Sequence, residues 1–330
     1  MLLNEKILAV LGVLADGEFH SGEELGLVLG VTRAAVWKHI QSVESLGLNV
    51  SSVRGKGYKV EGGVDLLDQQ KIVSKLSEGV QKQLPDIEVV NELESTNQYL
   101  LDKLNAKENL ASGHVCLAEI QTAGRGRRGR VWQSPFAQNI YFSCVWHFQN
   151  GIAGMEGLSL AIGLAVVRAL QSLGVEQLSL KWPNDILINN AKLGGVLIEI
   201  AGDAGGDCDA VIGVGLNVRM PAAAMKGVDQ PWVNLSQVFS GTLARNTIAA
   251  EIINHLIVLM GEFEKGGFQT LQKEWEAYSA HLNKHVCLHM PTETVEGKML
   301  GVAGNGALRL EVGGEEKSFI GGEVSLRVSV

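Results

Sequence analysis

The sequence predicts an α+β protein built from three parts: a winged helix-turn-helix, a central mixed sheet flanked by helices, and a small C-terminal β-barrel. The first sixty residues carry three amphipathic helical patterns and two short strand patterns. Strands and helices then alternate, and the segment NNAK at 189–192 joins two apolar strands as a hairpin, which favours a mixed sheet over a doubly wound one. From about Lys284, short strands alternate with glycine turns.

Composition indicates a soluble, folded, cytoplasmic protein. The 330 residues are 46% hydrophobic, which is enough for sizeable cores. The first apolar run has Glu5 and Lys6 before it and Asp16 after it, so it is too short and too quickly acidic for an export signal. We expect no window to approach the roughly 18 apolar residues of a membrane span. Four scattered cysteines without CxxC spacing indicate reduced thiols rather than zinc or disulfide sites: Cys116, Cys144, Cys208 and Cys287.

The first two predicted helices follow from periodicity and capping signals. Apolar residues at i, i+3, i+4 and i+7 define a helix that ends near Gly17: Ile7, Val10, Leu11 and Leu14. The S-x-x-E pattern from Ser21 to Glu24 predicts a capping box, in which each side chain satisfies a backbone amide of the other residue. Gly30 is expected to close this second helix.

A third helix with a polar outer face follows at once. Thr32 is expected to be its N-cap, Gly47 its end, and Val36, Ile40 and Val43 its apolar face. The segments LNVSSV and GYKVEG then predict two strands of a wing, with a basic hairpin tip between them.

A change of charge accompanies this motif. Residues 1–30 carry one base and five acids, whereas residues 31–60 carry five bases and one acid. Basic and amide side chains facing outward from a helix-turn-helix predict insertion of the third helix into the major groove, with the wing tip on phosphate or the minor groove. The alternative is a protein-interaction module whose charges are merely solvated. The DNA-binding candidates are Ser21, Thr32, Arg33, Trp37, Lys38, Gln41, Arg54 and Lys56.

The remainder divides into a central and a C-terminal region, which gives predicted domains at 1–63, 64–283 and 284–330. A connecting helix is expected over 64–79. Strands are expected at 87–91, 114–122, 139–147, 178–182, 186–189, 195–200 and 210–218, and helices at 97–104, 155–173 and 247–263. C-terminal strands are expected at 286–290, 295–303, 306–312, 317–322 and 323–328, with hairpin signals at 305–306 and 313–314.

The segment GRGRRGR at 124–130 predicts an anion-binding loop. It matches G-x-G-x-x-G, but Pro135 and a strand follow instead of a helix, and no acid lies between Arg125 and Asn150 to hold a ribose. A Walker loop is absent, and an RNA-binding RGG tether would have more low-complexity sequence around it. Glycines let backbone amides converge and guanidinium groups bind phosphate bidentately, so we expect a loop that orders around a phosphate-bearing ligand. The alternative is a solvated basic surface loop.

Two further polar clusters accompany this loop. The segment KWPNDILINNAKLGG places Lys181, Asn184 and Asp185 at the end of one strand and Lys192 just before another. Taken alone, Lys192 reads as a hairpin-tip lysine. The segment ESTNQ places Ser95, Thr96 and Asn97 at a helix N-terminus, where they are either a cap or ligand contacts.

Together, these motifs and the N-terminal winged helix closely resemble the bifunctional biotin protein ligases that also repress biotin biosynthesis. The resemblance covers essentially the whole chain in the same domain order, with GRGRRGR and KWPNDI…KLGG as its most specific part. It implies a catalytic domain like that of class II aminoacyl-tRNA synthetases and biotin ligases, and an SH3-like C-terminal barrel. It also implies the reaction, in which the biotin carboxylate attacks the α-phosphate of ATP and a carrier-protein lysine then takes the acyl group from biotinyl-5'-AMP.

The resemblance also implies roles for individual residues. The catalytic set is Arg127, Lys181 and Lys192, which would stabilise charge on the reacting phosphate. The biotin-binding set is Ser95, Thr96, Asn97, Gln121, Arg125, Gly126, Arg127, Trp132 and Lys192. The ATP and adenylate set is Gly124, Arg125, Arg127, Arg130, Asn184, Asp185, Asn217 and Trp232.

The implied cofactors are ATP and Mg²⁺ carried with it, with biotin as substrate and no dedicated metal cage in the chain. The implied partners are the biotin carboxyl carrier protein of acetyl-CoA carboxylase, operator DNA of the biotin genes and a second copy of the chain when the adenylate is bound; no membrane is expected. Two rival interpretations are a biotin-sensing transcription factor without ligase activity and a lipoate ligase. The intact arginines and lysines disfavour the first, and the DNA-binding domain and GRGRRGR disfavour the second.

Overall fold

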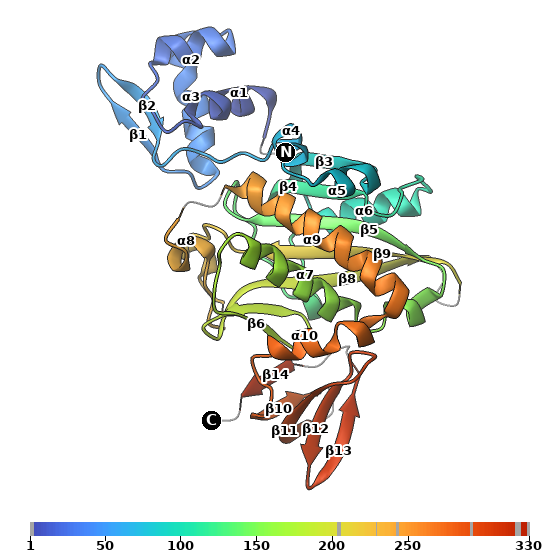
Figure 1. The fold of residues 1–330 in the computed structure, drawn as a ribbon. Coiled ribbons are helices and arrows are strands. Elements are labelled where there is room, and N and C mark those ends of the chain that lie inside the picture. Colours follow the sequence, from blue (N-terminus) through green and yellow to red (C-terminus); the bar gives the residue numbers. More distant parts are fainter. Residues whose placement is uncertain are drawn as a thin grey trace.

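The structure is a computed structural model that describes residues 3–202, 206–228, 230–241, 244–290, 293–320 and 325–328. Three bodies follow one another along its length (Figure 1): a small N-terminal domain, a central sheet with helices and a C-terminal sheet. This is the predicted α+β arrangement. The predicted boundaries at 63/64 and 283/284 fall between β2 and α4 and just before β10, respectively.

The N-terminal domain is a helix-turn-helix with a wing. Its helices are α1 (Glu5–Leu14), α2 (Gly22–Leu29) and α3 (Arg33–Ser45), and its antiparallel strands are β1 (Val50–Val53) and β2 (Gly57–Val60). The apolar stripes of α1 and α3 predicted from the sequence are buried together in one cluster. These elements therefore form as the sequence predicts.

Two predicted caps in this domain differ from the structure. The Ser21 hydroxyl accepts from the Glu24 amide, as predicted, but the Glu24 carboxylate pairs with the His20 ring at 2.9 Å instead of returning to Ser21, so the capping box is only half formed. Thr32 occupies the N-cap position of α3 without a side-chain cap bond. The turn before it is closed by backbone instead, with Gly30 in the left-handed region at φ 62°.

The predicted connecting helix over 64–79 is wrong. The structure has two short helices, α4 (Gln69–Val73) and α5 (Glu78–Gln83). Asp68 and Ser77 each accept a bond from a backbone amide three residues later, so each begins its own helix and interrupts a continuous one.

The central sheet has seven strands in the order β3-β4-β5-β9-β8-β7-β6, and only the β3–β4 pair is parallel. It therefore is the mixed sheet that the sequence predicts. Its strands are β3 (Ile87–Leu93), β4 (Val115–Gln121), β5 (Ile140–Phe148), β6 (Leu178–Lys181), β7 (Asp185–Ile188), β8 (Ala191–Gly202) and β9 (Cys208–Leu216). Its helices are α6 (Thr96–Asn105), α7 (Leu158–Ser172), α8 (Leu235–Val238), α9 (Arg245–Gly266) and α10 (Gln272–Ala277).

The hairpin between β7 and β8 is tighter than predicted. Asn189 and Asn190 both have positive φ, 50° and 62°, and form a two-residue turn that suits the twist of the strands. As a result, β8 begins at Ala191 and already contains Lys192, which was expected just before the strand.

The short helices α8 and α10 were not predicted from the sequence, because each is too short to show an apolar period.

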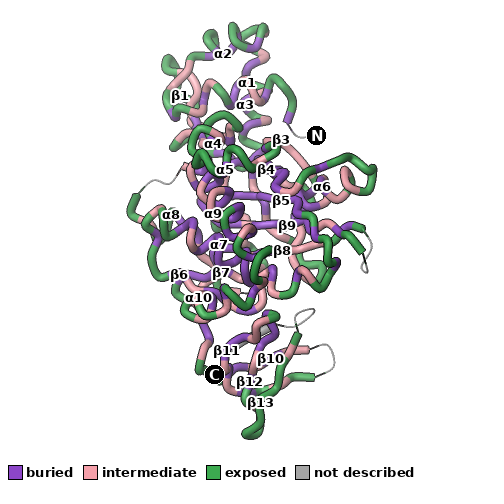
Figure 2. Tube along the Cα trace, turned by 45° about the vertical axis from the view of Figure 1, so that its right-hand side comes forward, coloured by how far each residue is buried: buried purple, intermediate pink, exposed green. Residues whose placement is uncertain are grey.

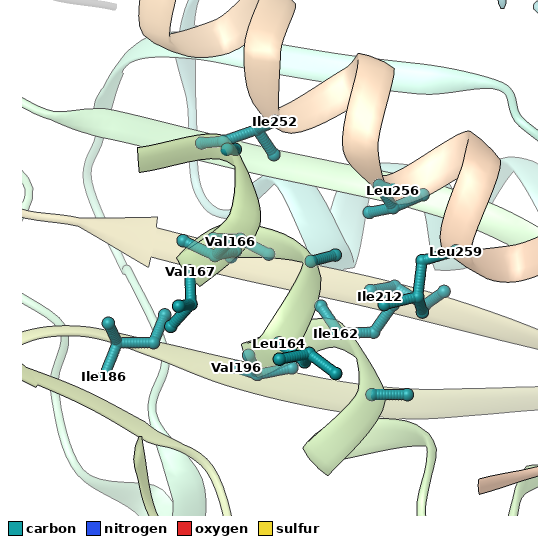
Figure 3. Packing of buried hydrophobic residues seen from close by; sticks show 14 of the residues in the cluster. Ile162, Leu164, Val166, Val167, Ile186, Val196, Ile212, Ile252, Leu256 and Leu259 are labelled. Carbon is teal, nitrogen blue, oxygen red and sulfur yellow. The ribbon is translucent and has the colours of Figure 1, made fainter. Parts of the chain in front are cut away.

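Helix α7 lies in the main core, packed against the sheet and against the neighbouring helix α9 (Figure 3). Ile162 and Val166 on α7 belong to the same buried cluster as Ile212 of the sheet and Leu256 of α9.

Contrary to the sequence expectation, residues 151–172 are long and apolar enough to cross a membrane, with a mean hydropathy of 1.5. More than half of this window, 56%, is buried inside the protein, as is usual for the central helix of a folded core.

The C-terminal region is a five-stranded antiparallel sheet, in the order β13-β12-β11-β10-β14. Gly313 and Gly314, at φ 63° and 86°, form the predicted turn between β12 and β13. Residues 321–324, on which part of the last two predicted strands falls, lie outside the described residues, as do residues 329 and 330. The five strands are β10 (His285–His289), β11 (Thr294–Val302), β12 (Leu308–Val312), β13 (Glu315–Phe319) and β14 (Ser325–Val328).

The N-terminal domain shares its core with the central one. Buried residues follow the central strands and α7, whereas β13 and much of α2 are exposed (Figure 2). Phe136 and Ala137, which follow the arginine-rich loop, are buried in the hydrophobic cluster of the N-terminal domain. The DNA-binding motif and the loop are therefore joined by packed side chains as well as by the chain itself.

Candidate active site

A pocket of about 840 Å³ opens over the sheet and collects the polar motifs found in the sequence. The N-terminus of α6 closes one side of it, the arginine loop another, and residues 281–284 the far end. Predicted site residues that line it are Ser95, Thr96, Asn97, Gln121, Arg125, Gly126, Arg127, Arg130, Trp132, Lys181, Asn184, Asp185 and Lys192.

One end of the pocket holds neutral hydrogen-bonding groups. The Thr96 amide and hydroxyl both donate to Gln121 Oε1, at 2.9 and 3.2 Å, and the Ser143 hydroxyl contacts Thr96 Oγ1 at 2.7 Å and Asn97 Oδ1 at 2.6 Å. Ser95 is the N-cap residue of α6 but makes no side-chain cap bond. This network fixes the side chains in place and suits a polar ligand without charge.

The floor of the pocket is flat because β9 carries glycines on one face. A Cβ at Gly213 would lie 2.4 Å from Asn97 Oδ1, and one at Gly215 would lie 2.5 Å from the Trp132 ring. The alternation of glycines in GVGLN is a sequence signal for such a close approach, which the sequence analysis did not use. Trp132 therefore lies directly on the strand.

The arginine loop forms a compact turn. Gly126 N donates to Arg130 O at 2.8 Å, and Arg128 and Gly129 have positive φ, 59° and 71°. Arg127 donates to Asn184 Oδ1 at 3.3 Å, and burial together with the neighbouring Arg128 lowers the pKa of its guanidinium. A pocket that lowers the pKa of an arginine favours the binding of an anion there.

Arg125 has a different environment from Arg127. Its guanidinium pairs with Glu199 at 2.8 Å, and the same carboxylate accepts from Asn97 at 2.9 Å. Glu199 thus joins the arginine loop to the N-terminus of α6. We expect Arg125 to orient the loop as well as to contact a ligand.

Lys192 is held in the middle of the pocket. Its Nζ lies 2.6 Å from Asp185 Oδ1 on the neighbouring strand and 5.6 Å from the centroid of the Trp132 ring. The side chains of Lys192 and Asp185 are only 17% and 14% exposed, so their ion pair is shielded from solvent. Lys192 is therefore more than the hairpin-tip lysine that its sequence position alone suggests.

Residues 278–284 close the pocket beyond β6. Leu180 N donates to Tyr278 O and Ala280 N donates to Leu180 O, so this segment runs beside Lys181. His281 and Lys284 line the pocket from here, and Lys284 Nζ donates to Ala280 O at 2.8 Å. Neither residue could be predicted from the sequence, because nothing local in the chain marks a contact across about a hundred positions.

Three predicted site residues do not line the pocket. Gly124 is buried beneath the loop, where a Cβ would meet Trp132 O at 2.5 Å. Asn217 is buried, donates to Val233 O at 3.1 Å and keeps an Oδ1 without a partner. Trp232 forms a backbone bridge with Lys192 but does not line the pocket itself. Further lining residues that the sequence analysis did not name are Arg128, Val131, Trp182, Pro183, Gly195, Gly213, Gly215, Gln230 and Pro231.

The charge of the pocket is strongly positive. Among the described residues that line it, Asp185 is the one carboxylate, and Lys192 pairs with it. The cationic lining residues are Arg125, Arg127, Arg128, Arg130, Lys181, Lys192 and Lys284. Such a pocket can hold a neutral polar group at one end and a polyphosphate at the other, and can stabilise negative charge that develops between them.

The predicted DNA-binding residues all lie on the surface of the N-terminal domain. The Ser21 hydroxyl, however, already caps α2 by accepting a hydrogen bond from the Glu24 amide. Trp37 is 53% exposed on α3, which is unusual for a large aromatic side chain. Lys56 lies 5.7 Å from the Phe19 ring. Exposed residues of this set are Ser21, Thr32, Arg33, Trp37, Lys38, Gln41, Arg54 and Lys56.

Three family models match the chain in this order. Residues 5–59 match an HTH domain, residues 89–217 match the biotin/lipoate A/B protein ligase family, and residues 281–327 match the biotin protein ligase C-terminal domain. The bifunctional ligase/repressor BirA of Escherichia coli is 41% identical over 97% of this chain and 97% of its own length. The biotin--[acetyl-CoA-carboxylase] ligase of Mycobacterium tuberculosis is 32% identical over 72% of this chain and 88% of its own.

Solved structures agree with these matches. The biotin protein ligase from Aquifex aeolicus in complex with biotin and ATP superposes with a TM-score of 0.64 and 25% identity. It covers 74% of this chain and 100% of that chain.

Proposed function

Because the chain belongs to the biotin/lipoate A/B protein ligase family, we propose that it adenylates biotin with ATP and transfers the biotinyl group to a lysine of a biotin carboxyl carrier protein. With biotinyl-5'-AMP bound, it also represses biotin genes through its winged helix. The observation that carries the ligase part is the single pocket in which a neutral polar end, a fixed lysine and a cationic loop meet. The cytoplasm is the compartment where both activities have their partners.

The reaction sets simple demands on the pocket. A biotin carboxylate oxygen bonds to the α-phosphorus, the bond from that phosphorus to the bridging oxygen breaks, and pyrophosphate leaves with the electron pair. Negative charge is spread over the phosphate oxygens in this step, so positioned cations supply most of the stabilisation. We assign that role to Arg127, Lys181 and Lys192.

Binding roles follow from the two ends of the pocket. Ser95, Thr96, Asn97 and Gln121 offer donors and acceptors to the uncharged ureido ring of biotin, and Trp132 packs on its body. Arg125, Arg130, Asn184 and Asp185 surround the phosphate region, and the loop glycines, Gly124 and Gly126, let the backbone approach. Asn217, with an unpaired buried Oδ1, and Trp232 remain proposals for the adenine.

Magnesium would enter with the nucleotide. Asp185 is the one carboxylate among the described residues that line the pocket, and it is already paired with Lys192. Mg²⁺ would be held by the phosphates of ATP and by water, with Asp185 nearby, and would supply further charge neutralisation.

The glycines of β9 under the pocket give a testable prediction about biotin binding. We expect Gly215→Ala to displace Trp132 and to weaken biotin binding about tenfold or more, because overpacking typically costs 1–3 kcal/mol. Gly195 is directly opposite Gly215 in the ladder, yet a Cβ there would meet its nearest atoms at an ordinary 3.4 Å, so Gly195→Ala should cost much less. Calorimetric titration with biotin measures both. Equal affinities for the two variants would contradict the assigned position of Trp132.

The surface of the N-terminal domain gives a second prediction. We expect Lys56→Ala to weaken binding to operator and unrelated DNA alike and to reduce the salt slope by about one, since it removes a phosphate contact. Gln41→Ala should instead relax sequence preference, as an amide on the recognition helix reads base edges. Fluorescence anisotropy at several salt concentrations measures both, with Lys265→Ala at the end of α9 as control. A control that weakens DNA binding as much as Lys56→Ala would reject the assigned surface.

We also propose that the adenylate promotes a homodimer, because one winged helix spans only half of a two-fold symmetric site. Equilibrium sedimentation with and without biotinyl-5'-AMP tests this part, and a monomer in both conditions rejects it. Transfer of labelled biotin to purified carrier protein, with lipoate as the competing substrate, tests the ligase. Lipoate transfer without biotin transfer would overturn the substrate, and adenylate-dependent DNA binding without any transfer would indicate a sensor.

A further inference from the structure

His281 is a buried polar side chain with an unsatisfied ring nitrogen. It is 5% exposed, lines the pocket, and its buried Nδ1 has no hydrogen-bond partner. Nearly all buried polar atoms in folded proteins have a partner, so an exception inside a ligand pocket indicates an atom that a ligand satisfies.

The surroundings of His281 favour an anion. Lys181 at the end of β6 and Lys284 before β10 line the pocket with His281, and the positive charges of both act on its ring. Burial first, and then the two ammonium groups, lower the pKa of His281 to about 4. The ring is therefore neutral at pH 7, and it can donate a hydrogen bond without adding a further charge that the lysines would repel.

The position of His281 in the fold indicates which anion. The groups assigned to biotin include the N-terminus of α6, where Asn97 lies over Gly213 of β9, and β6 is three strands further along the sheet from β9, roughly 14 Å away at about 4.8 Å per strand. Lys192 on β8 lies between the two ends. In phosphoryl transfer the leaving group departs opposite to the attacking oxygen, so pyrophosphate has to lie on the side away from biotin. That side is where His281 lies.

We propose that His281, between Lys181 and Lys284, contacts the β- and γ-phosphates of ATP and the pyrophosphate that leaves. The assignment rests on the proposed ligase function. His281 donates a hydrogen bond to a phosphate oxygen and transfers no proton: the electron pair of the broken bond stays on pyrophosphate, and the lysines balance its charge. Residues from the junction with the C-terminal sheet thereby complete a site that the central domain alone leaves open at one end.

Two substitutions and one direct titration test the proposal. His281→Phe removes both ring nitrogens at similar volume, whereas His281→Asn keeps an amide near the position of Nδ1. In biotin-dependent ATP–pyrophosphate exchange we expect the phenylalanine variant to raise the KM for ATP and for pyrophosphate about tenfold or more, as for loss of a bond to a charged group. The asparagine variant should stay within about threefold of the native protein. The KM for biotin should change in neither variant.

The titration uses the native protein and inorganic pyrophosphate. By NMR, we expect the pKa of His281 to rise when pyrophosphate is added, because the anion neutralises Lys181 and Lys284. The proposal would be overturned if His281→Phe left the KM for ATP and for pyrophosphate unchanged, or if it raised the KM for biotin as much as that for ATP. It would also be overturned if the pKa of His281 did not change when pyrophosphate is added. Native protein without any biotin-dependent exchange would instead refute the ligase function, and the titration would still decide whether His281 meets a polyphosphate.

Discussion

Lys192→Ala is expected to slow the formation of biotinyl-5'-AMP by about a hundredfold to a thousandfold, the usual effect of removing one fixed group that stabilises transition-state charge. The lysine is held by Asp185 at 2.6 Å and by the face of Trp132, so its ammonium group needs little reorganisation during the reaction. The measurement is single-turnover adenylate formation from biotin and ATP, with kcat and KM separated in steady-state exchange.

The pairing with Asp185 supplies the matched control. Asp185→Asn keeps the shape of the partner but removes its charge, so Lys192 stays in the pocket with less restraint. We expect a smaller loss of rate than for Lys192→Ala. Arg127→Ala should resemble Lys192→Ala, since Arg127 is the arginine of the loop that burial and Arg128 hold at a lowered pKa. Adenylate formation at the native rate in Lys192→Ala would remove this lysine from the mechanism.

The parts of the fold that could be predicted are those with a local signal. The stripe from Ile7 to Leu14 is periodic over two turns, Gly30 and Asn189 stand where positive φ is needed, and the strands of the sheet are apolar runs bounded by turns. The site could be predicted because its polar groups lie in three short motifs, and the resemblance assigned them chemistry. The pocket brings most of them together.

The rest depends on contacts that no local pattern encodes. His281 and Lys284 reach the pocket because their segment, which follows α10, pairs with β6 about a hundred positions earlier in the chain. The connecting segment breaks into two helices because Asp68 and Ser77 compete as caps, and because its first residues bond to the N-terminus of α9. Tertiary bonds thus overrode a helical pattern that was plausible on its own.

Glu119→Gln is expected to destabilise the central domain by about 3–5 kcal/mol, because it leaves a guanidinium buried without its counter-charge. Arg245 and Glu119 are 0% and 2% exposed and lie 2.7 Å apart. Arg245 also donates to Asn139 O at 2.9 Å and to Asp65 O at 2.8 Å, and the second oxygen of Glu119 accepts from the Leu67 amide. The ion pair therefore connects β4 and α9 to residues 65–67, the segment that follows the DNA-binding domain.

The matched control is an ion pair on the surface. Arg309 and Glu316 approach to 2.6 Å across β12 and β13, but their side chains are 31% and 48% exposed, so Glu316→Gln should have a far smaller effect on the free energy of unfolding. Urea denaturation followed by tryptophan fluorescence compares the two variants. A loss for Glu119→Gln no greater than that for Glu316→Gln would show that the buried guanidinium finds other compensation.

A double substitution distinguishes the effect of an unpaired buried charge from the effect of losing the bonds that hold the connecting segment. In Glu119→Gln with Arg245→Met, the unpaired charge is gone, so the double variant should be more stable than the sum of the two single losses predicts. The double substitution still weakens the hydrogen bonds between residue 245 and Asp65 and between the Leu67 amide and residue 119. The connecting segment is therefore less firmly held. We therefore expect the double variant to recover much of its stability and its adenylation rate, while the coupling between adenylate binding and DNA affinity falls. Recovery of that coupling together with stability would mean that the packing of Phe136 alone joins the two domains.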